Sequence, residues 1–325
     1  ATEIIVPTDM PLNVAVAAAA SGDIITILPS GSPYLTYPSL AITNKHLTIR
    51  GSTGNPADVV IDGFALDVVF RITGASAAGT VIQDLTVANG RGAATNDSSG
   101  GGVILTTGAN TTFRNVVFRD NVVPAPDGNG AGIYSNGCSL RIENCLFQNN
   151  QVSSSTGDGA GMYATGGTHA VIGTTFRNNR HVSPASGSYA GGLWGDNSSW
   201  SIVACTFEDN LAWEGGGVCM GASASAVVDA CKFVHNTARQ GGGLWVASNA
   251  GAVTVRNGLF TGNVSTGDNS AAYVGRSATF MNCTFTGNVA ANAYVISGSA
   301  GVILDNSIIW GNTGPGAILF ANQVI

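Results

Sequence analysis

The sequence contains little charge and almost no lysine. Charged residues make up 10% of its 325 residues, against roughly 25% in typical soluble domains. The lysines are Lys45 and Lys232 alone. No run of Lys or Arg is present and the formal net charge is −6, so the chain lacks the basic patch with which proteins bind nucleic acid. We therefore predict no nucleic-acid partner.

Long apolar runs are missing as well. No segment approaches the roughly 18 apolar residues that a membrane-spanning helix needs, and Val14–Ala20 is far too short. No basic stretch precedes this segment, so it is not an obvious signal peptide. We predict that the chain has no transmembrane segment.

Metal-binding patterns are also absent. The six cysteines include no Cys-x-x-Cys pair, which makes a zinc site improbable. The chain lacks the nine-residue glycine-rich repeat that binds calcium, and Asp127 and Asp158 resemble calcium-loop residues only faintly. We predict no metal ion or other cofactor, with calcium left as an alternative that no motif supports.

What the sequence does contain is a repeat. The motif Phe-x-x-Asn recurs seven times, and successive Phe residues are 29, 29, 31, 26, 27 and 25 positions apart. The copies are Phe118–Asn121, Phe147–Asn150, Phe176–Asn179, Phe207–Asn210, Phe233–Asn236, Phe260–Asn263 and Phe285–Asn288, with Ile309–Asn312 as a variant. A fixed period of this length is typical of a solenoid, in which each repeat forms one turn.

Alternation within each repeat predicts β-strands. The residue five places before each Phe is apolar and the residue two places before it is small, while the residue four places before it varies. The small positions include Cys145, Cys205, Cys231 and Cys283. Alternating inward and outward residues indicate strands. In stacked parallel strands Phe would lie on Phe, and the Asn amides would form hydrogen bonds along the axis.

These patterns predict an all-β fold, a right-handed parallel β-helix of roughly ten to eleven coils. We expect one domain over residues 1–325. Its parts are a cap with a helix at Leu12–Ser21 within 1–23, irregular coils over 24–100, regular coils over 101–312, and an uncapped or truncated end over 313–325. A helix at the start would cover the open apolar end of the first coil. We also expect that a further domain could follow residue 325.

The repeat resembles that of a known group of proteins. Phe-x-x-Asn alternates with tetrapeptides such as Gly130-Ala131-Gly132-Ile133 and Gly241-Gly242-Gly243-Leu244, which resembles the polymorphic outer-membrane proteins of Chlamydia. More broadly, the chain is similar to the pectate-lyase-like β-helix superfamily. The resemblance covers the repeats from about Gly101 to Asn312 and the opening of the chain. It implies a secreted or cell-surface, adhesin-like protein that binds a polysaccharide or a cell-surface glycan.

A polar column suggests chemistry. The residues four places before the apolar residue that follows the glycines are all polar. They are Ser99, Asn129, Asp158, Tyr189, Glu214, Gln240 and Asn269. Two coils separate Asp158 from Glu214, which places them about 9–10 Å apart by the strand spacing, at the upper edge of the separation in an inverting glycosidase.

Three further residues come from the same loops: His181, Trp213 and Arg239. The catalytic candidates are therefore Asp158, Glu214, Tyr189, Arg239 and His181, with Trp213 stacking on a sugar ring. The alternative is a row of polar residues at a solvent-facing turn. The motifs of a polygalacturonase, such as Asn-Thr-Asp and Gly-His-Gly, do not occur.

A second column is rich in aromatic residues and is expected to face outward by alternation. It comprises Ile104, Tyr134, Tyr163, Trp194, Cys219, Trp245 and Val274. Adjacent outward aromatic rings could bind the apolar faces of sugars, which makes Tyr134, Tyr163, Trp194 and Trp245 candidate substrate-binding residues together with Trp213. The alternative is that surface loops cover and bury this column.

Three functions therefore remain open. The outward aromatic residues favour a secreted or surface protein that binds carbohydrate. The carboxylate pair favours a polysaccharide lyase or glycoside hydrolase. The regular Phe and Asn columns favour a purely structural solenoid segment.

Overall fold

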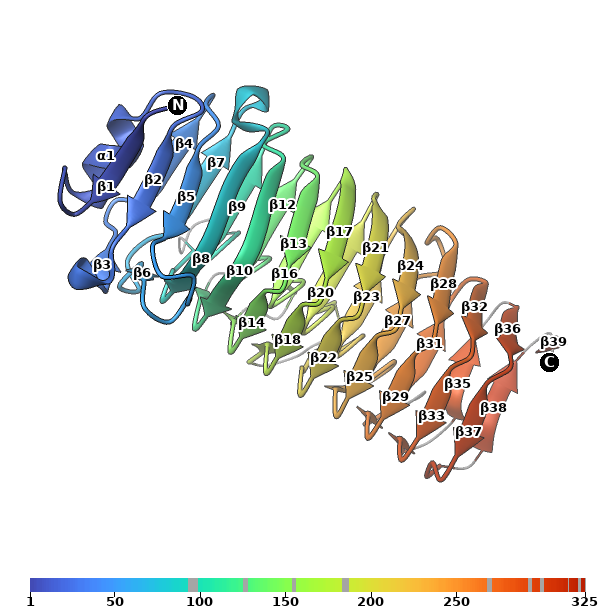
Figure 1. The fold of residues 1–325 in the computed structure, drawn as a ribbon. Helices are drawn as coiled ribbons and strands as arrows, with labels where there is room; N and C mark the ends of the chain where they lie inside the picture. Colours follow the sequence, from blue (N-terminus) through green and yellow to red (C-terminus); the bar gives the residue numbers. More distant parts are fainter. Residues whose placement is uncertain are drawn as a thin grey trace.

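The computed structural model describes residues 1–92, 99–124, 128–153, 156–182, 187–267, 271–291, 294–298, 301–314, 316–320 and 323–324, with side chains described as far as residue 314. The chain winds into a long parallel β-solenoid whose coils follow one another from the amino to the carboxyl end (Figure 1). Every strand pairing between named strands is parallel, which confirms the predicted all-β parallel β-helix. In parallel stacking, each strand satisfies its backbone groups through the coils before and after it.

One coil shows how the chain turns. β13 (Leu140–Glu143), β14 (Leu146–Gln148), β15 (Gln151–Val152) and β16 (Met162–Thr165) succeed one another, and β17 (Thr168–Ile172) begins the next coil. Each strand then pairs with its counterpart in the following coil, so four strand positions build four stacked sheets.

Sheet 1 contains the first strand of each coil. Its strands are β1 (Glu3–Val6), β2 (Ile24–Ile27), β5 (Thr48–Gly51), β8 (Thr80–Ala88), β10 (Thr111–Arg119), β13, β17, β21 (Ser199–Val203), β24 (Ser225–Asp229), β28 (Val253–Arg256), β32 (Ala278–Met281), β36 (Val302–Asp305) and β39 (Gln323–Val324). Sheet 2 is continuous with it, because β8 and β10 run through both sheets. Its other strands are β3 (Tyr34–Leu35), β6 (Val60–Asp62), β14, β18 (Thr175–Arg177), β22 (Thr206–Glu208), β25 (Lys232–Val234), β29 (Leu259–Thr261), β33 (Thr284–Thr286) and β37 (Ile308–Trp310).

Sheet 3 consists of very short strands, and sheet 4 closes the coil. Sheet 3 contains β11 (Val122–Val123), β15, β19 (Arg180–His181), β26 (Thr237–Ala238), β30 (Val264–Ser265) and β34 (Val289–Ala290). Within the described residues, sheet 4 has 11 strands, namely β4 (Leu40–Thr43), β7 (Phe70–Thr73), β9 (Val103–Thr106), β12 (Ile133–Asn136), β16, β20 (Leu193–Asp196), β23 (Val218–Met220), β27 (Leu244–Val246), β31 (Ala272–Val274), β35 (Tyr294–Gly298) and β38 (Gly316–Phe320).

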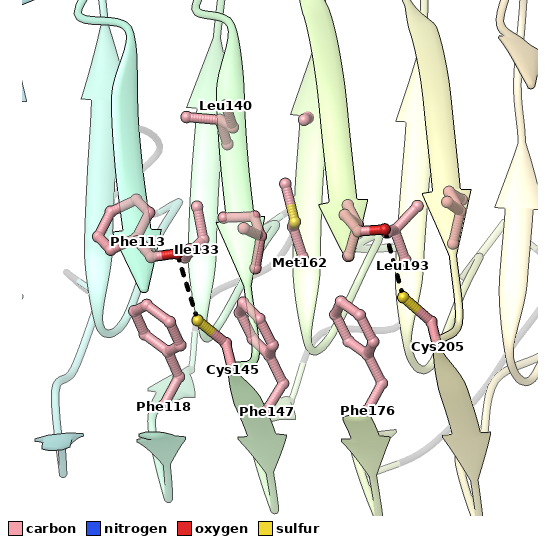
Figure 2. Close-up of a cluster of buried hydrophobic side chains, with 14 of the residues drawn as sticks. Phe113, Phe118, Ile133, Leu140, Cys145, Phe147, Met162, Phe176, Leu193 and Cys205 are labelled. Carbon is pink, nitrogen blue, oxygen red and sulfur yellow. Dashed lines mark hydrogen bonds between the residues drawn. The ribbon is translucent and has the colours of Figure 1, made fainter. Parts of the chain in front are cut away.

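The interior contains a stack of phenylalanine rings. The Phe of each motif lies on the Phe of the next, with ring centroids 4.4–5.2 Å apart and rings within 15° of parallel. Figure 2 shows Phe118, Phe147 and Phe176 in this row, with Met162 and Leu193 packing from sheet 4. Stacked rings are the predicted outcome of the repeat, and they place the core between sheets 2 and 4.

The Asn of each motif forms a second internal ladder. Each of these residues from Asn121 to Asn288 is fully buried. Asn150 Nδ2 donates to Asn179 Oδ1 at 2.8 Å and to the Phe118 carbonyl at 2.9 Å, and the Asn150 backbone N–H donates to Asn179 Oδ1 at 3.1 Å. The same pattern repeats in the later coils. The predicted hydrogen bonding along the axis is therefore confirmed.

All six cysteines are buried and free. The four that share a column point inward, as predicted; Cys145 Sγ, for example, donates to the Phe113 carbonyl at 3.6 Å (Figure 2). Cys138 joins the main core, whereas Cys219 lies in a small cluster outside sheet 4. These thiols fill space rather than crosslink coils.

A helix covers the first coil. α1 (Leu12–Ala18) is shorter than the predicted Leu12–Ser21 and buries Leu12, Ala15 and Val16. Two short 3₁₀ turns, Pro29–Gly31 and Ala75–Ala77, complete the helical segments. Lys45 Nζ donates to the carbonyls of Val16, Ala17 and Ala19, a cation placed at the negative end of the helix. The strand β1 was not foreseen: the first coil begins inside the segment predicted to be only a cap.

Candidate functional site

The polar column forms a ladder at the turn before sheet 4. Parallel bridges join Asp158 to Tyr189, Tyr189 to Glu214 and Glu214 to Gln240. The Asn129 carboxamide oxygen accepts from the Asp158 backbone N–H at 2.7 Å. The structure therefore stacks these side chains as the repeat predicts, with Tyr189 between the two carboxylates.

Glycine shapes this turn. Gly159 has φ +59°, and a Cβ placed there would lie 2.2 Å from the Met162 carbonyl and 3.0 Å from Tyr163 Cα. A Cβ at these distances would force backbone atoms to shift, so glycine is favoured at this position. Ala190 takes the same left-handed conformation in the next coil, with φ 55°. The turn therefore folds the polar column back against the strands of sheet 4.

The environment of Asp158 favours its neutral form. The pKa of this carboxyl is raised to about 8, chiefly by burial and to a lesser extent by the nearby charge of Asp196, against a hydrogen bond that Oδ1 accepts from the Tyr189 backbone N–H at 3.2 Å. Burial also raises the pKa of Glu214, while the positive charge of Arg239 opposes that shift. A carboxyl that keeps its proton near neutral pH can donate a hydrogen bond or act as a general acid.

Aromatic rings lie beside this column on the outer side of sheet 4. The register of the strands places these residues in one column: Ile104, Tyr134, Tyr163, Trp194, Cys219, Trp245 and Tyr273. We call this surface, together with Tyr189, the aromatic face. Tyr134 stacks on Tyr163 at 5.3 Å and Trp245 on Tyr273 at 5.9 Å, and the Tyr189 ring contacts both Trp194 and Trp245, at 5.1 and 5.2 Å.

Two expectations about this column need correction. The sequence placed Val274 in it, but the pairing of β27 with β31 sets Tyr273 opposite Trp245, and Val274 is fully buried on the inner side. Trp194 is only 9% exposed and Cys219 is not exposed at all, because Tyr189 packs over them. The polar turn thus covers the middle of the face, while Tyr134, Tyr163, Trp245 and Tyr273 remain partly accessible.

One carboxylate at this site was missed from the sequence. Asp196 ends β20 and projects from the same side as Trp194, two residues earlier. Burial raises the pKa of Asp196, although hydrogen bonds from Asn197 and the Ala222 backbone oppose the shift. A Cβ at Gly221 would lie 2.6 Å from the Trp194 ring and 2.9 Å from Asp196 Oδ1. The alternation that identified Trp194 could have identified Asp196 as well.

The remaining candidates lie around this face to different extents. The Arg239 guanidinium sits 5.4 Å from the ring centre of Trp213, a cation–π contact, and both residues are half-buried beside Glu214. His181 is fully buried in sheet 3, where Nε2 lies 3.3 Å from the Tyr189 carbonyl. Burial lowers the pKa of His181 to about 4. That interior position argues against the catalytic role assigned to His181 from the sequence.

The described residues were compared with the requirements of a metal site and of a membrane-spanning helix. Among them, no group of three or more His, Cys, Asp or Glu side chains is placed to hold a metal ion. Within the same residues, no helix is both long and apolar enough to cross a membrane. Asp127 and Asn269 lie outside the described part of the chain.

The family comparison concerns most of the chain. Residues 69–322 match the family described as "Right handed beta helix region", which is more than three quarters of the sequence. A search of curated proteins finds no match.

Solved structures with a similar course of the chain include two viral proteins and one enzyme. They are the ORF18 protein of Geobacillus virus E2 (13% identity, TM-score 0.40, 96% of this chain and 58% of that chain), an alginate lyase from Paenibacillus sp. strain FPU-7 (11%, 0.31, 94% and 95%) and tailspike protein 3 of bacteriophage CBA120 (11%, 0.37, 96% and 56%). The chain thus spans little more than half the length of the two viral proteins.

Proposed function

The chain belongs to the family of right-handed β-helix regions, and we propose that it is a secreted or cell-surface protein that binds a polysaccharide or cell-surface glycan along its aromatic face. The likeness of its repeats to those of surface adhesins supports the location. The geometry of sheet 4 supports the binding.

One observation carries the proposal. Aromatic side chains occupy five of seven consecutive positions in the outward column of sheet 4, from Ile104 to Tyr273. Successive strands lie about 4.8 Å apart, and the rings form a track of two accessible pairs, Tyr134–Tyr163 and Trp245–Tyr273, with the Tyr189 ring packed between them over Trp194 and Cys219. The half-buried carboxyls of Asp158 and Glu214 lie along one edge of this track, and Asp196 lies on the same strand as Trp194. Aromatic rings with polar groups at their margins suit a sugar, which has apolar faces and polar edges.

Catalysis is a second candidate, favoured by the raised pKa of Asp158. A proton donor with a pKa of about 8, two coils from the carboxyl of Glu214, could act as the general acid of a glycoside hydrolase. The test is release of reducing ends, or of unsaturated products, from acidic and neutral polysaccharides. Turnover that disappears in both Asp158→Asn and Glu214→Gln would establish an enzyme at this face.

Binding is tested first by isothermal titration of a panel of oligosaccharides into the wild-type protein and Trp245→Ala. We expect the variant to lose at least about tenfold in affinity, as buried aromatic contacts commonly do when truncated. The matched control is Trp310→Ala, because Trp310 is 77% exposed on sheet 2, away from this face. Circular dichroism verifies that both variants fold.

The proposal fails if no oligosaccharide binds. It also fails if Trp245→Ala and Trp310→Ala weaken binding equally, because the ligand would then lie elsewhere. Binding without turnover favours an adhesin-like protein over an enzyme.

A further inference from the structure

Three carboxylates at the aromatic face have no basic partner. Among the residues that the structure describes, Asp158, Asp196 and Glu214 form no ion pair with Lys, Arg or His. Arg239 is the cation whose charge acts on Glu214, and its guanidinium lies over the Trp213 ring instead. Removing carboxylates from water without a counter-charge is costly.

Several carboxylates elsewhere on the solenoid form ion pairs with arginine. Glu143 pairs with Arg114 at 2.9 Å, Glu208 with Arg177 at 2.9 Å, and Asp229 with Arg256 at 3.1 Å. These partners lie one coil apart in sheets 1 and 2, where the carboxylate side chains are 16%, 29% and 26% exposed. The acids of the aromatic face are also half-buried, but among the described residues they have no such ion pair.

The segments that the structure leaves undescribed contain no basic residue that could pair with these carboxylates. None of the undescribed residues, among them 93–98, 125–127, 154–155, 183–186 and 268–270, is Lys, Arg or His. When these carboxyls are ionised, the protein can supply a counter-charge only from Arg239 or from another described residue that moves, and a cationic ligand is the other source.

Two indole groups at the same face also lack partners. Trp194 Nε1 and Trp245 Nε1 are buried and, within the described residues, have no acceptor in hydrogen-bond geometry, although the Trp194 side chain lies close enough to the Tyr163 hydroxyl to oppose the rise in its pKa. Trp194 is only 9% exposed, and the Tyr189 ring packs against both indoles. A buried N–H without an acceptor is costly, and a ligand hydroxyl is one group that would satisfy it.

We propose that the aromatic face binds a glycan bearing protonated amines, a polymer of amino sugars that are not acetylated. This inference rests on the proposed glycan-binding function and names its ligand class. The ammonium groups would pair with Asp158, Asp196 and Glu214, the ring faces would attract the same cations, and the sugar hydroxyls would accept from the indoles. A single metal ion suits this site less well, because no described cluster offers three ligands to it.

The raised pKa values of Asp158, Asp196 and Glu214 fit this ligand. A cation that enters the site favours the ionised carboxylate, so it reverses the effect of burial. A uronic acid polymer would do the opposite, because its own carboxylates would be repelled once these acids ionise.

The test compares three hexasaccharides with the same β-1,4 linkage: glucosamine, N-acetylglucosamine and glucose. Isothermal titration is performed near neutral pH with the wild-type protein, Asp158→Asn, Asp196→Asn and Asp305→Asn. Asp305 is exposed at the end of β36 on sheet 1, so Asp305→Asn removes a carboxylate away from the aromatic face. We expect the glucosamine hexamer to bind at least about tenfold more tightly than the other two, as charge-assisted hydrogen bonds allow.

The three Asp-to-Asn variants then show which carboxylates bind the amines of the ligand. Asp158→Asn and Asp196→Asn should each remove most of the advantage of the glucosamine hexamer, while Asp305→Asn should keep it within about twofold, because exposed single charges contribute little. An equal loss in all three variants would show general attraction to an acidic protein and would overturn the inference.

The outcomes separate this inference from the proposed function. If all three hexamers bind equally and Trp245→Ala weakens all of them, the face binds glycans but does not select amines, and only the inference is overturned. If none of the hexamers binds, while other oligosaccharides do bind through Trp245, the inference is again overturned alone. If no oligosaccharide binds at all, both the proposed function and this inference are contradicted.

Discussion

The inner corner between sheets 2 and 3 and the outer face of sheet 4 follow opposite rules. In the corner, the same two residue types recur in every regular coil, and the buried Asn side chains are hydrogen-bonded from coil to coil. On the aromatic face the residue type changes at almost every coil, and the carboxyls and indoles of that face are left partly unsatisfied. Uniform, satisfied groups are what stability requires, whereas irregular, unsatisfied groups are typical of a binding site.

We expect the largest loss of stability from a substitution in the phenylalanine stack of the core. Phe176 is fully buried, with its ring centroid 4.5 Å from Phe147 and 4.9 Å from Phe207. Phe176→Ala removes one ring from the stack and should lower the free energy of unfolding by about 4 kcal/mol, as Phe-to-Ala changes in cores do. Urea unfolding followed by circular dichroism measures this. A loss below about 1 kcal/mol would mean that the stack contributes little to stability.

The Asn ladder should have the next largest effect. Asn179→Ala removes the acceptor of the Asn150 backbone N–H and a donor to the Phe147 carbonyl, which should cost about 2 kcal/mol. The control is Asn178→Gly, because Asn178 is exposed and has φ 58°, a conformation that glycine adopts freely. Equal losses in the two variants, again measured by urea unfolding, would contradict a special role for the buried ladder.

The third effect concerns the other side of the comparison and depends on pH. The Asp158 carboxyl ionises near 3.8 in the unfolded chain and near about 8 in the folded protein. Between these values the folded state binds a proton that the unfolded state has released, so stability is fully present below about pH 4 and is lost as pH rises through about 8. The slope is at most about 1.4 kcal/mol per pH unit.

Asp158→Asn removes this titration. The variant should therefore gain stability relative to wild type as pH rises from about 4 to about 8, whereas Asp305→Asn should show no such trend. Urea unfolding at several pH values gives both differences. If the difference between Asp158→Asn and wild type does not change with pH, Asp158 is solvated in the folded protein and the electrostatic account of the face is wrong.

Most of the fold could be predicted because the structural residues repeat. A Phe or an Asn in the same place of successive coils has the same neighbours above and below, so its environment can be inferred from the period alone. The first coils lack this regularity. β1 was missed because Glu3–Val6 is a short strand with no copy of the motif near it, and α1 ends before its predicted limit because Ala19 leaves helical geometry.

The site was predicted less completely, for reasons that concern register and burial. The column of Asp158, Tyr189 and Glu214 follows directly from the repeat. The loop between sheets 3 and 4 varies in length, however, so the predicted register was wrong by one residue in the last coil of the column: Val274 was predicted to face outward, whereas Tyr273 does. Burial cannot be read from alternation when a neighbouring turn covers the sheet. For that reason Trp194 and Cys219 are far less exposed than expected, and His181 proves to lie in the interior.

The most direct test of the account is a crystal structure of the protein soaked with the glucosamine hexamer. The account predicts an ordered oligosaccharide along the outer side of sheet 4 between Tyr163 and Tyr273, with amines next to Asp158 and Asp196. An oligosaccharide ordered on another surface, such as the groove on sheet 1 lined by Asn110, Arg141 and Thr168, would contradict it.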